Sequence, residues 1–162
     1  MEEKVKKPLS RVSQLVNFRL RDEEFGVDIS SVREITKVTE ITRVPEAPGF
    51  VKGITNLRGE IIPVIDLAFQ LGLPPQEKQP ESARIVVTEI MHQTVGILVD
   101  EVPEVLRIPE ENIEPTPQLI DSEINKEYIR GVGKLEHRLI LLLNLDKILT
   151  SHQMEKLAGV EA

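Results

Sequence analysis

The chain has 162 residues, which suits one domain or two very small ones, and such a length buries roughly two-thirds of the surface of the unfolded chain. A net charge of −7 disfavours nucleic-acid binding, whose affinity comes largely from neutralisation of phosphates by Lys and Arg. Aromatic residues make up 3% of the chain, so a base-stacking platform is also disfavoured. Because there is no cysteine, disulfides, thiol nucleophiles and thiolate metal ligands are excluded.

The sequence also lacks the signals of a membrane protein. No stretch contains the 18 or more uninterrupted apolar residues of a membrane span. The charged segment Met1 to Lys7 is not followed by the apolar core of a signal peptide. These features predict a soluble cytoplasmic protein with no direct membrane insertion.

Short strands separated by turn signals open the chain. Phe18 to Leu20 leads through four polar residues into Phe25 to Val27, which predicts a hairpin. Between Ile29 and Ile35 the apolar residues recur every third position, the spacing of a helical turn. Ser30 or Ser31 is expected to cap that turn by accepting a backbone N–H.

A second hairpin is predicted further along the chain. Gly53 to Leu57 and Glu60 to Ile65 resemble two strands joined tightly at Arg58-Gly59, where glycine permits a positive φ. Pro63 has no N–H for a ladder, so it is expected at an edge or a bulge.

Helix caps follow the predicted strands. Asp66 is expected to cap a short helix from Leu67 to Leu71, which Gly72 and Pro74 end. Pro74 to Glu81 is a polar, proline-rich connector. Near the C-terminus, Asn144 is expected to cap a longer helix through Leu145, Ile148, Leu149, Met154 and Leu157, ended by Gly159.

The chain contains a weak internal duplication. A shift of 70 residues aligns Phe25–Ile35 with Val95–Val105, and the same shift pairs Leu15-Val16 with Ile85-Val86. A shift of 78 aligns Phe50–Ile54 with Tyr128–Val132 and continues through Leu57 and Leu135 to Leu67 and Leu145. The change of shift indicates an eight-residue insertion in the second copy, within Pro109–Glu127.

The duplication defines the expected architecture, which is mainly β with short helices. About five short strands per unit predict a small closed barrel for each copy. The expected divisions are an N-terminal tail at 1–12, a first barrel subdomain at 13–80, a second barrel subdomain at 81–150 and a C-terminal helical extension at 151–162, with residues 12–150 together forming one domain.

No pattern of residues predicts catalysis. Neither GxGxxG nor GxxxxGK[ST] is present, and His92, His137 and His152 do not have the spacing of a helical zinc pair. We therefore predict no catalytic, cofactor or metal site. A hydrolase or metal enzyme using Asp28, Asp66 or His92 is an alternative that elemental analysis and mutation would test. A nucleic-acid-binding small barrel is another, which a salt-dependent oligonucleotide shift would support.

Arg58 stands out because the predicted turn presents it rather than burying it. Its guanidinium can form two parallel hydrogen bonds with a carboxylate or with backbone carbonyls. The equivalent residue of the second copy is Glu136, which reverses the charge on a similar frame. The other interpretation is that turns are simply polar. We favour the hypothesis that the two barrels bind different partners.

The segment Val51–Leu67, which contains Asn56-Leu57-Arg58-Gly59-Glu60, closely resembles the signature of the bacterial chemotaxis coupling protein family, CheW. Phe25–Ile35, Val95–Asp100 and Tyr128–Val132 resemble it too, and the resemblance spans about residues 12 to 150. It implies two SH3-like five-stranded barrels and a non-enzymatic adaptor of a two-component system. The implied partners are the cytoplasmic tip of methyl-accepting chemotaxis receptors and the regulatory domain of the chemotaxis histidine kinase, at membrane receptor arrays.

The resemblance also implies which residues bind those partners. The positions associated with coupling or receptor contact are Val32, Glu34, Ile35, Gly53, Asn56, Arg58 and Gly59. Kinase contact is associated with the second barrel and transfers only as a region, for which the apolar residues of Val95–Val105 are the expectation. These are Val95, Ile97, Val99, Val102 and Val105.

Overall fold

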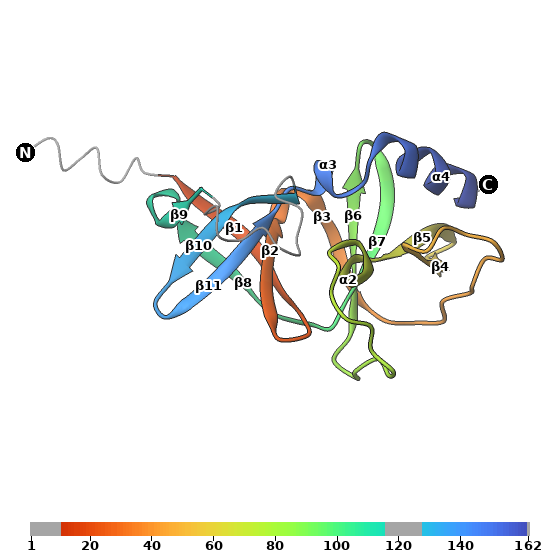
Figure 1. Cartoon of the computed structure of the whole chain (residues 1–162), viewed down its shortest axis with the longest axis horizontal. Coiled ribbons are helices and arrows are strands. Elements are labelled where there is room, and N and C mark those ends of the chain that lie inside the picture. The colour runs from red at the N-terminus through yellow and green to blue at the C-terminus, as the bar shows by residue number, and fades with distance from the viewer. Residues whose placement is uncertain (1–10, 116–127, 162) are drawn as a thin grey trace, which may run out of the picture.

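A computed structural model describes residues 11–115 and 128–161 of the chain (Figure 1). The predicted N-terminal tail, apart from its last two residues, and most of the predicted insertion in the second copy lie outside the described residues. The fold is mainly β, as predicted, and its strands gather in two halves of an elongated molecule (Figure 1).

Both copies of the duplication contain the same succession of five strands and a short helix, and the second has the additional short strand β9. The first copy comprises β1 (Val12–Leu20), β2 (Glu23–Asp28), β3 (Val32–Lys37), β4 (Val51–Leu57), β5 (Glu60–Asp66) and α2 (Leu67–Gln70). The second comprises β6 (Arg84–Ile90), β7 (Gln93–Val99), β8 (Glu101–Pro109), β9 (Ile113–Glu114), β10 (Ile129–Leu135), β11 (Arg138–Leu143) and α3 (Leu145–Ile148). Helix α4 (Ser151–Glu161) follows the second copy.

The two copies exchange their first hairpins. One sheet has the order β8-β1-β2-β11-β10-β9, and the other has the order β3-β6-β7-β5-β4. Parallel pairing of β2 with β11 and of β5 with β7 joins strands of different copies within each sheet. The expected boundary between 13–80 and 81–150 therefore does not separate the two sheets, because each sheet draws strands from both segments. Apolar alternation identifies a strand but not its neighbours in the sheet.

The duplication itself is confirmed in detail. Both second hairpins carry a bulge at their glycine, between Val51 and Gly53 in one sheet and between Ile129 and Gly131 in the other. In the first copy an isolated bridge pairs Thr42 with Ile54, and in the second β9 pairs Glu114 with Val132. These backbone features correspond under the shift of 78 that aligns the two sequences.

The largest core cluster joins residues of both sheets. It includes Phe18 and Phe25 from the first hairpin, Ile97 from β7 and Leu157 from α4. Leu15 belongs to a smaller cluster inside the six-stranded sheet, whereas its neighbour Val16 belongs to the shared core. Successive side chains of a strand point to opposite faces, so β1 is buried on both of them. The two halves therefore pack as one structure.

The helical turn predicted for Ile29–Ile35 is only partly correct. A 3-10 turn covers Ile29–Ser31, and β3 begins at Val32. A bulge between Val32 and Glu34 adds one residue to β3, which lengthens the apolar spacing from two to three. The cap is Asp28 rather than Ser30 or Ser31, because its Oδ1 accepts the N–H of Ser30 at 2.9 Å.

Pro63 lies on β5, an interior strand, and not at the edge of the sheet. Both backbone polar groups of Ile54, its partner on β4, bond to Thr42 instead. The ladder between β5 and β7 begins only at Val64. The missing N–H of Pro63 therefore removes no ladder hydrogen bond. The prediction was wrong about the edge but correct that Pro63 lies where no ladder N–H is needed.

The C-terminal helix is divided in two. Asn144 and Asp66 cap α3 and α2 as predicted, but α3 ends at Ile148 and Leu149 is extended (φ −113°, ψ 138°). Thr150 and Gln153 then form a reciprocal capping box for α4, with N–H to side-chain oxygen distances of 3.1 and 3.0 Å. Helix α4 continues through Gly159 to Glu161 and packs against β4 and β5.

Candidate functional site

The tip of the β4–β5 hairpin is a tight turn that points into solvent. Arg58 and Gly59 both have positive φ, 53° and 88°, as the sequence predicted for the glycine. Asn56 closes the turn, because its Oδ1 accepts the N–H of Gly59 at 2.8 Å. A Cβ on Gly59 would meet nothing within 4 Å, so the tip is open to a partner.

Arg58 extends from this tip to β3. Its Nη1 donates to Oε1 of Glu34 in an ion pair, while the Arg58 side chain stays 76% exposed. Ile35, which follows Glu34 on β3, is 39% exposed, and Ile61 on β5 is 52% exposed. We call these four residues, Glu34, Ile35, Arg58 and Ile61, the Arg58 face. Apolar side chains around an exposed charged group are typical of protein interaction surfaces.

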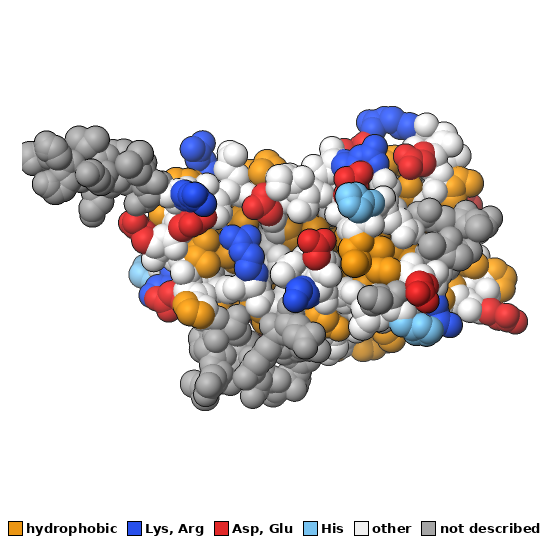
Figure 2. Space-filling view, turned by 90° about the horizontal axis from the view of Figure 1, so that it is seen from above, with side chains coloured by type: hydrophobic (Ala, Val, Ile, Leu, Met, Phe, Trp, Pro, Cys, Tyr) orange, Lys and Arg blue, Asp and Glu red, His pale blue; other side chains and the backbone are white. Residues whose placement is uncertain are grey.

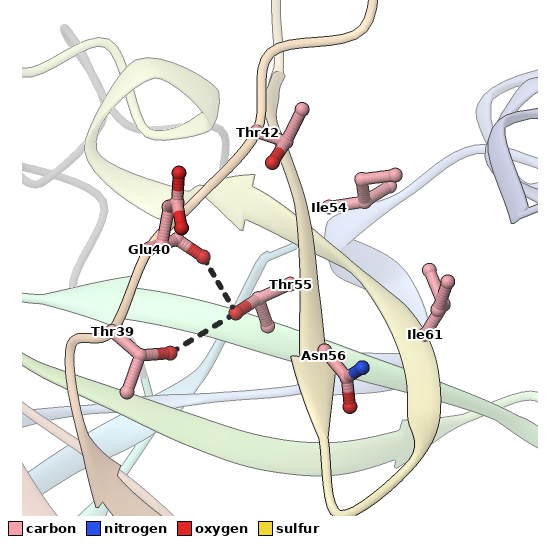
Figure 3. Close-up of a pocket in the computed structure, with 7 residues that line it drawn as sticks. All are labelled: Thr39, Glu40, Thr42, Ile54, Thr55, Asn56 and Ile61. Carbon is pink, nitrogen blue, oxygen red and sulfur yellow. Dashed lines mark hydrogen bonds between the residues drawn. The ribbon is translucent and has the colours of Figure 1, made fainter.

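A groove of about 260 Å³ continues from the Arg58 face along β4 (Figure 3). Thr55 Oγ1 donates to the carbonyl of Glu40 at 2.9 Å and lies 3.1 Å from the hydroxyl of Thr39. These bonds hold the segment after β3 beside β4, so the groove has fixed walls. Asn56 and Ile61 line its end near the hairpin tip (Figure 3).

Val32 and Gly53, which were also predicted to contact a partner, have structural roles. Val32 is half-buried against the shared core. Gly53 is buried, and a Cβ there would lie 2.4 Å from the carbonyl oxygen of Thr42. The glycine permits the close approach of two backbones rather than presenting a surface.

The six-stranded sheet carries an equivalent surface. Glu104, Val105, Glu136 and Leu139 correspond to the residues of the Arg58 face under the two shifts, and we call them the Leu139 face. Val105 is 47% exposed and Leu139 63% exposed. Glu136 has φ 57° at the tip of the β10–β11 hairpin, as Arg58 has at its own tip. Exposure of Ile61 and Leu139 was not predicted, although the shift of 78 pairs them.

Arg138 organises the charges next to the Leu139 face. It makes a bidentate contact with Glu24, Nη2 to Oε1 at 2.6 Å and Nε to Oε2 at 3.2 Å, and Nη2 reaches Glu104 at 3.1 Å. The hydrogen bond from Arg138 holds the pKa of Glu24 below its ordinary value, and the same bond raises the pKa of Arg138. The buried Asn17 amide also donates to Glu24, at 3.3 Å. This cluster was not predicted.

Three of the residues predicted for kinase contact are buried. Val95, Ile97 and Val99 are at most 1% exposed and belong to the shared core, so a partner cannot touch them directly. Their alternating positions on β7 all point into the space between the sheets. Val102 is partly buried against the same core, and only Val105 has a largely open side chain.

The residues of the alternative enzyme hypothesis have other roles or lie apart. Asp28 and Asp66 cap the turns that follow β2 and β5, and the N–H of Ser30 lowers the pKa of Asp28. His92 lies in the β6–β7 turn, at the opposite end of β7 from Leu98, which pairs with Asp66. Within residues 11–115 and 128–161, no three His, Cys, Asp or Glu side chains are grouped to hold a metal ion.

Acidic and basic side chains are intermixed over the face that carries α3 and α4 (Figure 2). A nucleic-acid surface needs a continuous basic patch, and this face has none. Among the described residues, no helix combines the length and apolar content that crossing a membrane requires.

Comparison with known proteins identifies the family. The CheW-like domain matches residues 14–153. The chain belongs to the CheW-like domain family. It is 37% identical over 142 residues to a probable chemotaxis protein CheW of Rhizobium etli, covering 88% of this chain and 90% of the relative. It is also 37% identical to the chemotaxis protein CheW of Klebsiella aerogenes, over 85% of this chain and 81% of that one.

A solved relative agrees with the fold. The scaffolding protein TtCheW from Thermoanaerobacter tengcongensis superimposes with a TM-score of 0.79 at 37% identity, covering 88% of this chain and 91% of the other. The resemblance inferred from the sequence is thereby confirmed, as is the mainly β fold with two sheets and few short helices. The chain is a chemotaxis coupling and scaffold protein, an adaptor of the CheW type.

Proposed function

We propose that this adaptor links the cytoplasmic tip of methyl-accepting chemotaxis receptors to the regulatory domain of the chemotaxis histidine kinase. It acts without catalysing a reaction, in the cytoplasm at membrane receptor arrays. The Arg58 face, with Asn56 and Gly59 shaping its tip, binds the receptor. The Leu139 face, which includes Val105, binds the kinase by contact between like barrels.

The observation that carries the proposal is the exposed Arg58–Glu34 pair on a rigid turn. Arg58 donates to Glu34 with only part of its guanidinium, and its side chain is 76% exposed. A guanidinium has five N–H donors, so most remain available for a carboxylate or carbonyl of a partner. Ile35 and Ile61, which are both exposed, supply apolar area that a receptor helix buries when it binds.

Coupling requires only differential binding. A receptor change alters kinase activity when the adaptor contacts the two receptor states with different free energies. Each contact is modest alone, and avidity within an array stabilises the assembly. A rigid nanomolar complex with an isolated receptor fragment would contradict this mechanism.

Affinity capture of a receptor tip fragment and of the kinase regulatory domain tests the assignment. Arg58→Ala should weaken receptor capture at least tenfold, about 1.4 kcal/mol, and leave kinase capture unchanged. Arg11→Ala removes another exposed arginine, outside both faces, and serves as the matched control. Equal receptor capture by wild type and Arg58→Ala would refute the role of the Arg58 face.

A further inference from the structure

Asp100 is the residue at which the chain passes from the five-stranded sheet, after β7, to the six-stranded sheet, before β8. All of its polar groups have partners. Its N–H donates to the carbonyl of Arg19 at 2.9 Å, and its own carbonyl accepts the hydroxyl of Ser82 at 2.6 Å. Its carboxylate accepts the backbone N–H of Arg21 at 2.6 Å and the amide of Gln76 at 3.2 Å.

Arg21 connects this residue to two other parts of the fold. Its Nη1 lies 3.1 Å from Oδ2 of Asp100, and its Nε donates to the carbonyl of Pro74 at 2.8 Å. Arg21 is in the β1–β2 turn of the six-stranded sheet, whereas Pro74 lies after α2, the helix that follows β5 of the five-stranded sheet. The side chains of Arg21 and Asp100 are only 19% and 15% exposed, so solvent screens their ion pair little.

The contact exists on one side of the duplication. Under the shift of 70 residues, Arg21 corresponds to Met91 and Asp100 to Ser30. Met91 has the same turn conformation, φ 51° against 58°, but its thioether cannot form an ion pair. The equivalent crossing, at Ile29–Ser31, is instead stabilised locally by Asp28. Arg21 thus adds bonds to Asp100 at the crossing and to Pro74 beyond the five-stranded sheet that the symmetric frame does not require.

We propose that Arg21 and Asp100 form a latch that fixes the angle between the two sheets, and with it the relative orientation of the Arg58 and Leu139 faces. Apolar burial in the shared core holds the sheets together but is non-directional, so it allows small sliding movements. A charge-assisted, multiply bonded pair at the periphery is directional and opposes such sliding. The value of the latch for signalling rests on the proposed function, whereas its effect on geometry does not.

The geometry can be measured in the isolated protein. Because the chain has no cysteine, Gln14→Cys on β1 and Glu89→Cys on β6 place one spin label on each sheet at exposed positions. Arg21→Met, which copies the residue of the second copy, should shift or broaden the interspin distance distribution by roughly 1–2 Å. Asp100→Asn should have the same effect. Arg19→Met is the matched control, because Arg19 pairs with Glu101 within one sheet.

The outcomes separate the latch from a contribution to stability alone. A lowered melting temperature with an unchanged distance distribution in both latch variants overturns the proposal. In a reconstituted receptor–kinase assay, Arg21→Met should bind each partner separately like wild type but lose receptor control of the kinase. If wild type binds neither partner, the proposed function fails, and the distance measurement still decides on the latch.

Discussion

The Arg58 face and the Leu139 face have equivalent positions in the two copies, but the charge is reversed at the hairpin tip and at one position beside each face. The hairpin tips carry Arg58 in one sheet and Glu136 in the other, and two residues later Glu60 is replaced by Arg138. Each face nevertheless neutralises its β-strand glutamate, since Arg58 pairs with Glu34 and Arg138 with Glu104. The arginine is presented at the tip in the first face and held back beside Glu24 in the second.

This difference shows which positions the shared backbone constrains and which positions can differ between the two copies. Gly53 and Gly131 are retained because both lie where another backbone approaches closely, and both turn tips keep a positive φ. The charged positions at the tips carry no such constraint. Equivalent frames can therefore present opposite charges, and opposite charges favour different partners.

The largest expected effect comes from filling the space at the two bulge glycines. A Cβ on Gly53 would lie 2.4 Å from Thr42 O and 2.7 Å from Ile41 Cγ2, whereas one on Gly131 would lie 2.8 Å from Glu114 O. Gly53→Ala should therefore reduce the free energy of unfolding by about 3 kcal/mol or more, and Gly131→Ala by about 1–2 kcal/mol. Urea denaturation measures both free energies. An equal loss in the two variants would show that the different Cβ distances at the two glycines do not determine the cost.

The Glu24–Arg138 pair, next to the Leu139 face, should stabilise the protein more than the Glu34–Arg58 pair of the Arg58 face. Arg138 holds the pKa of Glu24 below its ordinary value of 4.5, so between the lowered pKa and 4.5 the folded state binds fewer protons than the unfolded chain does. The stabilisation is complete at neutral pH and is lost as the pH falls through the lowered pKa, because the unfolded chain takes up its proton first. Glu24→Gln should cost about 1–2 kcal/mol at pH 7 and much less at pH 3.

Glu34→Gln provides the comparison for that prediction. Its partner Arg58 is 76% exposed, so solvent screens the pair, and the expected cost is no more than about 0.5 kcal/mol at either pH. Urea denaturation of both variants at the two pH values measures the difference. A pH-independent cost for Glu24→Gln would contradict the assignment of the bidentate contact as the cause.

An effect smaller than that at the bulge glycines is expected where the copies end differently. The first copy leaves α2 through Gly72 and an irregular connector, whereas the second continues through Thr150 into α4. Thr150→Ala removes the hydroxyl that accepts the N–H of Gln153 and should cost about 1 kcal/mol of stability. Thr150→Ser keeps that acceptor and should cost little. Thermal unfolding measures the stability of both variants. Equal destabilisation by the two substitutions would argue against the capping box.

Local chemistry was predictable from the sequence because its causes lie within a few residues. The β4–β5 hairpin follows from Arg58-Gly59 between apolar strands, and the caps at Asp66 and Asn144 follow from side chains that accept nearby N–H groups. The break at Leu149 was not predicted, although Thr150 and Gln153 have the spacing of a capping box. The apolar spacing continues from Ile148 to Met154 and Leu157, which predicted a single helix across the cap at Thr150.

The site was predictable to the extent that exposure follows from turn geometry. Arg58, Asn56 and Gly59 lie at the exposed tip, as expected, whereas Val95, Ile97 and Val99 are buried. A strand that is half-buried and one that is buried on both faces contain similar apolar residues, so sequence does not distinguish a groove from a core. The contact of Arg138 with Glu24 joins residues 114 positions apart, which no local pattern encodes.

The sequence by itself determined the strands, the turns and the duplication, since periodicity, glycine and capping residues act over short distances. Only the tertiary structure decided that β1-β2 and β6-β7 exchange sheets, that one core joins both halves, and that Asp100 binds Arg21 across the crossing. Strand pairing is chosen by which complete set of faces buries the most apolar surface. That choice depends on all the strands together.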